Sequence, residues 1–218
     1  TPELSDRIYP QPAFDDETQT KQEADLTATE IAQPAIGAVS LAALRTLEQF
    51  GLTPDAACGH SYGELVALCA AGRLRPMELY QLSTRRGELM AASNGDHGAM
   101  LAVAAELGWV EDFLLKHDLD LVVANHNAPR QAVLSGVTYE IDRAQDLLSR
   151  EEVRIKRLPV AAAFHSSLVA QAGAPFAESL TSIEVTGSSV PVYANATGGT
   201  YPDRSADARE LLASQLTS

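Results

Sequence analysis

The sequence predicts an α/β protein in two parts: a parallel sheet with helices around it, and a smaller antiparallel subdomain inserted into that core. Three observations carry this prediction. A G-x-S-x-G sequence, Gly59–Gly63, stands between a strand-like run and a helix-like run. Residues 98–160 follow the order β-α-β-β-α-β, which is that of a ferredoxin-like subdomain. The chain beyond residue 161 returns to the first pattern, so we expect a large subdomain of residues 1–97 and 161–218 and a small one of residues 98–160.

The first fifty residues predict an arm followed by a long helix. Residues 1–25 are polar and contain several prolines, which is typical of a loop or a loosely packed arm. The run Thr27–Glu30 can form a capping box, and Gly51 ends the helix that follows it. Pro34 lies early enough in this helix to be tolerated. Its buried face is expected to carry the apolar residues that recur at near-helical intervals, which are Ile31, Ile36, Val39, Leu44 and Leu47.

The next segment has the order of a nucleophile elbow, the sharp turn that presents a catalytic serine. Residues 55–58 predict a buried strand, and residues 64–71 predict a helix that Gly72 ends. Such a turn exposes the Ser61 hydroxyl and directs the free N–H groups of the helix N-terminus at an oxyanion. The core is therefore predicted to be α/β-hydrolase-like. A further helix is expected from Pro76 to about Ala92.

The remaining elements follow from shorter patterns. In the inserted part we expect strands at residues 99–104, 121–124, 131–135 and 153–160, with helices at 109–116 and 139–151. The polar run Asn125–Arg130 is predicted to be a turn. After His165, residues 166–180 predict a helix that Gly173 and Pro175 bend or break. A strand at residues 190–195 and a helix from Ser205 onward complete the pattern.

Composition excludes several classes of function. The net charge of −13 and the lack of a basic stripe argue against a nucleic-acid partner. Cys58 and Cys69 have no metal-ligand spacing, and both are predicted to be reduced core residues. No run approaches the ~20 apolar residues of a membrane span. The polar N-terminus does not look like a signal peptide, so we expect a cytoplasmic protein that contacts no membrane.

A serine nucleophile needs a base within hydrogen-bond reach, and five histidines are available. Neighbouring side chains diverge on a sharp turn, so His60 is a poor base for Ser61. His165 is the best candidate, because it ends an apolar segment where the chain re-enters the main layer, although a buried structural histidine remains an open alternative. No acidic residue stands where a triad would need one, so a backbone carbonyl could orient the imidazole instead. Arg85 and Arg86 lie on the helix after the elbow helix, where a guanidinium could hold a carboxylate or belong to a solvated basic face. If this helix packs on the sheet, one of the two should point inward.

The ordered set of these motifs resembles the acyltransferase domain of fatty acid and polyketide synthases, the malonyl-CoA:acyl carrier protein transacylase family. The resemblance covers essentially the whole chain, and two of its motifs look most like the iterative synthases of enediyne polyketides and polyunsaturated fatty acids. The motifs that carry it are Tyr9–Phe14, Gly59–Glu64, Arg85–Gly87, Gly98–Met100, Asn125–Pro129 and Ala163–Ser166.

The resemblance implies a role for each site residue. Ser61 is the nucleophile, His165 the general base, and the backbone N–H of Tyr62 half of the oxyanion hole. Arg86 matches the arginine that clamps the free carboxylate of a malonyl group. His60, Phe164 and Asn125 are expected to line the substrate site, where Phe164 favours malonyl over methylmalonyl. The family's Gly-Gln-Gly-Ser-Gln loop and a late strand have no counterpart here, so we expect a fragment that lacks both family ends.

These points predict an enzyme that moves a malonyl group from malonyl-CoA through an acyl-serine to the phosphopantetheine thiol of an acyl carrier protein. No metal and no redox cofactor is implied, and other domains of a multifunctional synthase are expected partners. A hydrolase or thioesterase with the same Ser-His dyad is the first alternative, and a non-catalytic docking domain is the second. A basic patch for the carrier protein could come from Arg154, Lys156 and Arg157, which could instead form a solvated strand face. Some of these residues, or Arg73 and Arg75, could meet CoA phosphates.

Overall fold

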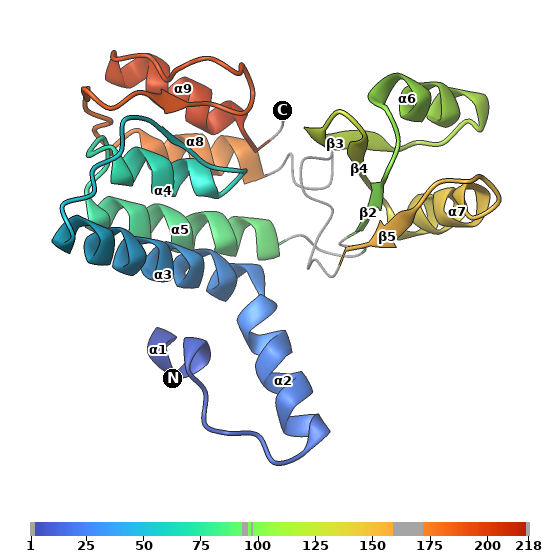
Figure 1. The fold of residues 1–218 in the computed structure, drawn as a ribbon, viewed down its shortest axis with the longest axis horizontal. Coiled ribbons are helices and arrows are strands. Elements are labelled where there is room, and N and C mark those ends of the chain that lie inside the picture. The colour runs from blue at the N-terminus through green and yellow to red at the C-terminus, as the bar shows by residue number, and fades with distance from the viewer. Residues whose placement is uncertain (1–2, 93–95, 97, 159–171, 217–218) are drawn as a thin grey trace. The chain divides into compact units, whose positions relative to one another are not determined.

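The computed structural model describes residues 3–92, 96, 98–158 and 172–216. The chain divides into two compact units, which are Thr1–Ala91 with Ala174–Gln215 and Ala92–Gly173 with Leu216–Ser218. Figure 1 shows the first unit as helices packed side by side and the second as a small sheet with two helices. Two residues expected in the site, Phe164 and His165, lie outside the described residues.

Helices dominate the first unit. Its helices are α1 (Leu4–Ile8), α2 (Asp16–Thr27), α3 (Thr29–Gln49), α4 (Gly63–Ala70), α5 (Pro76–Ala91), α8 (Gly173–Leu180, which begins one residue before the boundary) and α9 (Ser205–Ser214). Two short strands, β1 (Ala57–Cys58) and β6 (Val192–Tyr193), pair in parallel. The elbow strand, elbow helix and C-terminal helix thus form where the sequence predicts them, and Gly72 ends α4 with a φ of 72°.

The N-terminal segment, which the sequence predicts to be a loop or a loosely packed arm, is helical. Asp15 begins α2 by accepting hydrogen bonds from the Thr18 N–H at 2.7 Å and from the Thr18 hydroxyl at 2.9 Å. Because α2 continues through Thr27, the predicted capping box does not form, and α3 begins after Ala28 without a side-chain cap. Neither α1 nor α2 contains a buried residue.

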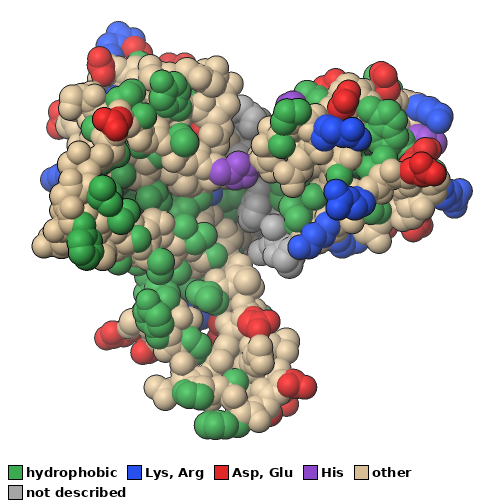
Figure 2. Space-filling view, viewed as in Figure 1, with side chains coloured by type: hydrophobic (Ala, Val, Ile, Leu, Met, Phe, Trp, Pro, Cys, Tyr) green, Lys and Arg blue, Asp and Glu red, His purple; other side chains and the backbone are tan. Residues whose placement is uncertain are grey.

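The apolar stripe predicted to be the buried face of α3 is largely exposed. Ile36, Val39 and Leu47 are 52%, 48% and 48% exposed, and Figure 2 shows such hydrophobic side chains at the surface of this unit. The buried residues of α3 are instead small or polar: Thr29, Gln33, Pro34, Ala35 and Gly37, together with Leu41.

The buried face of α3 carries small residues because α5 approaches it closely and lies along α3 in Figure 1. A Cβ placed on Gly87 would lie 2.6 Å from the Glu30 Cα and 2.8 Å from the Thr29 carbonyl oxygen. Helices this close leave no room for isoleucine or valine between them, so small side chains occupy the contact.

The prediction that both cysteines are reduced core residues is half right: both are free and Cys69 is buried, but Cys58 is exposed.

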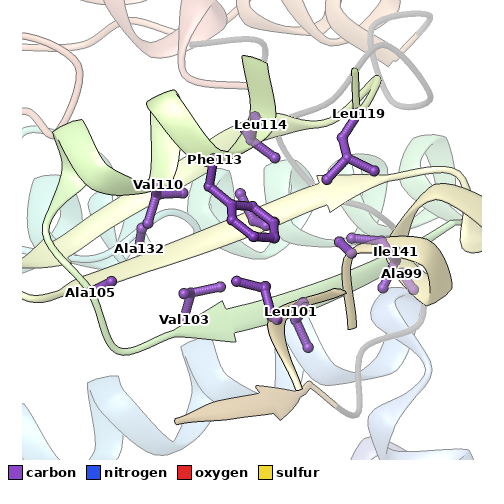
Figure 3. Packing of buried hydrophobic residues seen from close by; sticks show 13 residues of the cluster. Ala99, Leu101, Val103, Ala105, Val110, Phe113, Leu114, Leu119, Ala132 and Ile141 are labelled. Atoms are coloured by element: carbon purple, nitrogen blue, oxygen red, sulfur yellow. The ribbon is translucent and has the colours of Figure 1, made fainter. Parts of the chain in front are cut away.

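The second unit contains β2 (Ala99–Val103), α6 (Leu107–Lys116), β3 (Val122–Ala128), β4 (Gln131–Gly136), α7 (Thr138–Leu148) and β5 (Ile155–Arg157). This is the predicted β-α-β-β-α-β order, and the sheet runs β3-β4-β2-β5 with every neighbouring pair antiparallel. The core forms where the two helices cover the sheet, with Leu101, Val103, Phe113 and Ile141 pointing into it (Figure 3).

One predicted turn of this unit is a strand. Asn125, His126 and Asn127 belong to β3, and pairing with β4 continues through them to Ala128. Polar side chains are tolerated there because the end of β3 is exposed, and the ladder carries irregularities between Val123 and Asn125 and between His126 and Ala128.

Across the described ranges, no helix is long and apolar enough to cross a membrane.

The α3–α5 contact predicts that Gly87→Ala destabilises the protein. An added methyl group would meet backbone atoms of α3, which cannot rotate away, so we expect the free energy of unfolding to fall by about 1–3 kcal/mol. Urea denaturation followed by circular dichroism measures this. Gly108→Ala is the matched control, since Gly108 is also helical but has no atom within 4 Å of an added Cβ. That control should stabilise α6 by up to about 1 kcal/mol, and an equal effect of both substitutions would contradict the packing argument.

Candidate active site

The turn at Ser61 is strained and closed on itself. Ser61 has a φ of 51°, in the left-handed region that non-glycine residues seldom adopt. A Cβ on Gly59 would collide with the carbonyl group of Gly63, so glycine is required where the two ends of the turn meet. The α4 helix begins at Gly63, with Tyr62 as its N-cap. The half-buried Ser61 side chain is therefore held at the tip of a strand–turn–helix, which is the geometry of a nucleophile elbow.

Three backbone N–H groups of the turn donate to described residues. The Ser61 N–H donates to the Asn195 side-chain oxygen at 2.9 Å, and those of Gly63 and Glu64 donate to the carbonyls of His60 and Ser61 at 2.9 and 3.0 Å. The Tyr62 N–H donates to none of the described residues. It lies at the N-terminal end of α4, where the helix dipole favours negative charge. This N–H is suited to receive an oxyanion.

The aromatic side chain of Tyr62 is anchored in a notch between helices. Its hydroxyl lies 2.7 Å from the Ser83 hydroxyl, which itself donates to the Leu79 carbonyl at 2.6 Å. Burial raises the pKa of Tyr62 to about 12, which keeps the phenol protonated. Gly37 makes room for the phenol, since a Cβ there would collide with the Tyr62 oxygen. Tyr62 is thus fixed by α3 and α5 together.

Arg86 is a buried cation beside the serine. It is 2% exposed, and its Nη2 lies 3.3 Å from Ser61 Oγ. Its Nη1 donates to Gln33 Oε1 at 2.9 Å and its Nη2 also to Gln215 Oε1 at 3.3 Å. Burial lowers the pKa of Arg86 to about 10, and the guanidinium therefore stays protonated near neutral pH. Arg85 is exposed and lies 3.7 Å from Glu88, so only Arg86 faces the serine.

A buried carboxylate supports the turn from the other side. Glu64 is 1% exposed and accepts hydrogen bonds from the Tyr201 hydroxyl and from the Asn195 N–H. Burial raises the pKa of Glu64, while these two hydrogen bonds oppose the rise. Asn195 in turn holds the Ser61 N–H, and the Gln215 side chain donates to the Ser61 carbonyl. Segments far apart in the sequence therefore fix the backbone of Ser61 at both its N–H and its carbonyl.

The other residues predicted for the site are distributed as follows. His60 is exposed on the turn, and Asn125 is half-buried in β3 of the second unit. Phe164 and His165 lie outside the described residues, so the Ser61–His165 pair stays a prediction. In the described part of the chain, no group of three His, Cys, Asp or Glu residues could hold a metal ion.

The candidates for a basic patch differ in kind. Arg73 is buried and donates to the backbone carbonyls of Thr186, Tyr201 and Pro202, so its role is structural. Arg75 pairs with Glu78. Arg154, Lys156 and Arg157 are exposed on β5 or directly before it, and Arg157 pairs with Asp142. Figure 2 shows Lys and Arg beside Asp and Glu on the face of the second unit.

Sequence reasoning missed the residues that hold the site together, which are Gln33, Glu64, Asn195, Tyr201 and Gln215. Two of them carry a signal that could have been used. Gln33 interrupts an apolar stretch of α3, and Glu64 is an acidic residue at the start of an apolar helix. Asn195, Tyr201 and Gln215 reach the site only through tertiary contacts more than 120 residues away in the chain.

The chain matches the model of the acyl transferase domain over residues 15–214. It is 31% identical over 217 residues to one subunit of the polyunsaturated fatty acid synthase of Thraustochytrium, a match that covers 99% of this chain and 8% of that protein. It is 34% identical over 200 residues to the malonyl CoA-acyl carrier protein transacylase of Bacillus subtilis, covering 89% of this chain and 63% of the relative.

A solved structure of a protein with the same description is similar to this chain in fold. The malonyl CoA-acyl carrier protein transacylase of Burkholderia pseudomallei superposes with a TM-score of 0.81 at 34% identity, over 99% of this chain and 73% of that one. Of the two relatives compared by sequence, the chain spans less than a tenth of the Thraustochytrium protein and under two thirds of the Bacillus enzyme.

The Glu64 network predicts different effects for two substitutions. Glu64→Leu leaves the Asn195 N–H and the Tyr201 hydroxyl without an acceptor, so we expect a loss of about 2–3 kcal/mol in unfolding free energy. Glu64→Gln keeps an acceptor for Asn195, and the rotatable Tyr201 hydroxyl can accept from the new amide, so it should cost less than about 1 kcal/mol. Denaturation with urea measures both, and equal losses would contradict the network.

The stability difference between the wild type and Glu64→Gln should depend on pH. Because the pKa of Glu64 is higher in the folded protein than its usual value, its contribution to stability is full at acidic pH and is lost as the pH rises through the folded pKa. Glu64→Gln removes this contribution. The stability of the variant relative to the wild type should therefore rise between acidic and neutral pH, and a flat difference would contradict the shift.

Proposed function

The chain belongs to the acyl transferase domain family, and we propose that it moves a malonyl group from malonyl-CoA, through an ester on Ser61, to the phosphopantetheine thiol of an acyl carrier protein. One observation carries this proposal: the buried guanidinium of Arg86 lies 3.3 Å from Ser61 Oγ. A fixed cation beside a nucleophile suits an acyl group that ends in a carboxylate. It offers nothing to an acyl group that ends in a methyl group.

The proposed reaction has two half-reactions with one acyl-enzyme between them. Ser61 Oγ attacks the thioester carbonyl of malonyl-CoA while His165 takes the hydroxyl proton. The Tyr62 N–H stabilises the oxyanion of the tetrahedral intermediate. The C–S bond then breaks, and the CoA thiolate leaves with the proton that His165 holds. The malonyl ester remains on Ser61 with its carboxylate held by Arg86.

The second half-reaction repeats these steps with a different thiol. His165 takes the proton of the phosphopantetheine thiol, whose sulfur attacks the ester carbonyl. The intermediate collapses, Ser61 recovers its proton from His165, and the malonyl thioester leaves on the carrier protein. All charge changes in this scheme occur on the substrate carbonyl, the imidazole and the thiols, so neither a metal ion nor a redox cofactor takes part.

Specificity and partners extend the proposal. Phe164 would crowd the position of an α-methyl group and so favour malonyl over methylmalonyl, with His60 and Asn125 as further substrate contacts. The exposed residues Arg154, Lys156 and Arg157 are the proposed contact for an acidic carrier protein or for CoA phosphates. The relatives described above are transacylases and part of a synthase, which favours transfer to a carrier protein over hydrolysis. The similarity to the Thraustochytrium synthase also supports other synthase domains as partners.

Ser61→Ala should abolish covalent labelling by malonyl-CoA, because the ester oxygen is removed. Intact-protein mass spectrometry after incubation with malonyl-CoA measures the label directly. His165→Ala should retain Ser61 but slow its labelling by about 10²-fold or more, which is a typical contribution of a general base. A malonyl adduct on the Ser61→Ala protein would rule out the assignment. Wild-type labelling followed by release to water, unchanged by carrier protein, would identify a hydrolase.

Arg86→Ala should weaken labelling by malonyl-CoA far more than labelling by acetyl-CoA, because only malonyl presents a carboxylate. We expect a fall of about 10²-fold or more in kcat/KM for malonyl-CoA, as is usual when a buried charge pair loses one partner. Arg85→Ala is the matched control, since Arg85 is the exposed neighbour on the same helix and should leave both rates unchanged. Equal losses for the two acyl donors in Arg86→Ala would refute the clamp.

A further inference from the structure

Arg86 is held by side chains that carry no charge. Among the described residues, its three acceptors are the hydroxyl of Ser61 and the amide oxygens of Gln33 and Gln215, at distances of 2.9–3.3 Å. Buried arginines are ordinarily paired with a carboxylate, since burial of an isolated charge is costly. Here the cation is hydrogen-bonded but not neutralised by a direct partner.

Glu64 is the carboxylate whose charge acts on Arg86, and its hydrogen bonds go to other groups. Glu64 acts on Arg86 through the electrostatic field, but both of its carboxylate oxygens accept hydrogen bonds from other donors, the Tyr201 hydroxyl and the Asn195 N–H. Tyr62, the other group whose field reaches Arg86, is a phenol that burial keeps protonated. No carboxylate in the described part of the chain makes a hydrogen bond to Arg86.

The Gln33 amide is fixed at both ends. Its Oε1 accepts from Arg86 Nη1 at 2.9 Å, and its Nε2 donates to the Thr29 hydroxyl at 2.8 Å and approaches Met90 Sδ at 3.4 Å. Gln33 is 5% exposed and Thr29 is also 5% exposed. Because the Thr29 hydroxyl occupies the NH₂ end, the oxygen end is the one that faces Arg86. Thr29 and Gln33 are one turn apart on α3, at the close contact with α5 that Gly87 permits.

We propose that Gln33 is a positioning residue that, with Gln215 and Thr29, holds Arg86 by neutral hydrogen bonds, so that its positive charge remains available to the carboxylate of an incoming acyl group. This inference rests on the proposed function and names the feature that makes its site selective. A glutamine fixes the direction of the guanidinium as a glutamate would, but it does not cancel the charge that the substrate needs.

The decisive variant is Gln33→Glu, which keeps the shape and the acceptor atom and adds one negative charge. The Thr29 hydroxyl can turn to donate to the second carboxylate oxygen, so the hydrogen bonds to Arg86 and Thr29 survive and only the contact with Met90 Sδ is lost. We expect kcat/KM for malonyl-CoA to fall by about tenfold or more, mostly through KM, while that for acetyl-CoA changes by less than about twofold. Gln49→Glu is the matched control, because it adds the same charge to an exposed position of the same helix.

A second variant removes the anchor without adding a charge. Thr29→Val leaves the NH₂ end of Gln33 without its hydroxyl partner, so the amide is no longer fixed in one orientation. We expect a loss of about two- to fivefold in kcat/KM for malonyl-CoA and no change for acetyl-CoA. A purely structural role for Gln33 and Thr29 would instead lower both rates together.

A binding measurement separates this inference from the proposed function. Calorimetry with malonate on the Ser61→Ala protein requires no acyl transfer, and Gln33→Glu in that background should weaken malonate binding by about tenfold or more. If the wild type transfers malonyl but Gln33→Glu matches it in both assays, the neutral-anchor inference is overturned and the function stands. If malonate binds with the expected loss but no malonyl is transferred, the function fails and the inference stands. If malonate does not bind and no malonyl is transferred, both are overturned.

Discussion

The strained backbone of Ser61 is the constraint on which the rest of this structure depends. A left-handed conformation at a non-glycine residue such as Ser61 persists only when several independent contacts hold the backbone in it. Here Asn195 holds the N–H of Ser61, Gln215 holds its carbonyl, and the turn closes against Gly59. The buried Glu64 then fixes Asn195, so a carboxylate that has no part in the proposed reaction supports the proposed nucleophile.

The same contacts connect Ser61, the proposed nucleophile, to the guanidinium of Arg86. Gln215 accepts from Arg86 and donates to Ser61, which places the guanidinium and the serine in one hydrogen-bonded network. Arg86 reaches the serine because α5 lies close against α3, and that closeness requires Gly87 and the small residues of α3. Helix packing therefore determines where the charge lies, and the charge selects the acyl group in the proposed reaction.

Local patterns predicted the elements that local physics determines. The elbow, the glycine at the end of α4 and the β-α-β-β-α-β order follow from periodicity and turn residues within a few positions of each other. The errors came from tertiary context. Ile36 and Val39 have helical spacing but lie on the exposed face of α3, because the contact with α5 admits only small residues. Asn125 and His126 have the composition of a turn but lie in β3, because β4 supplies hydrogen-bond partners.

The Tyr62 side chain depends on residues of α3 and α5 that lie outside the pentapeptide Gly59–Gly63. Its phenol fills a notch whose walls come from α3 and α5, and its hydroxyl ends in a chain through Ser83 to the Leu79 carbonyl. Grafting this elbow into another protein would therefore carry over the serine turn without its support unless a glycine and a serine equivalent to Gly37 and Ser83 accompany it. Gly37, Tyr62 and Ser83 form one packing unit, although 46 positions separate the first from the last.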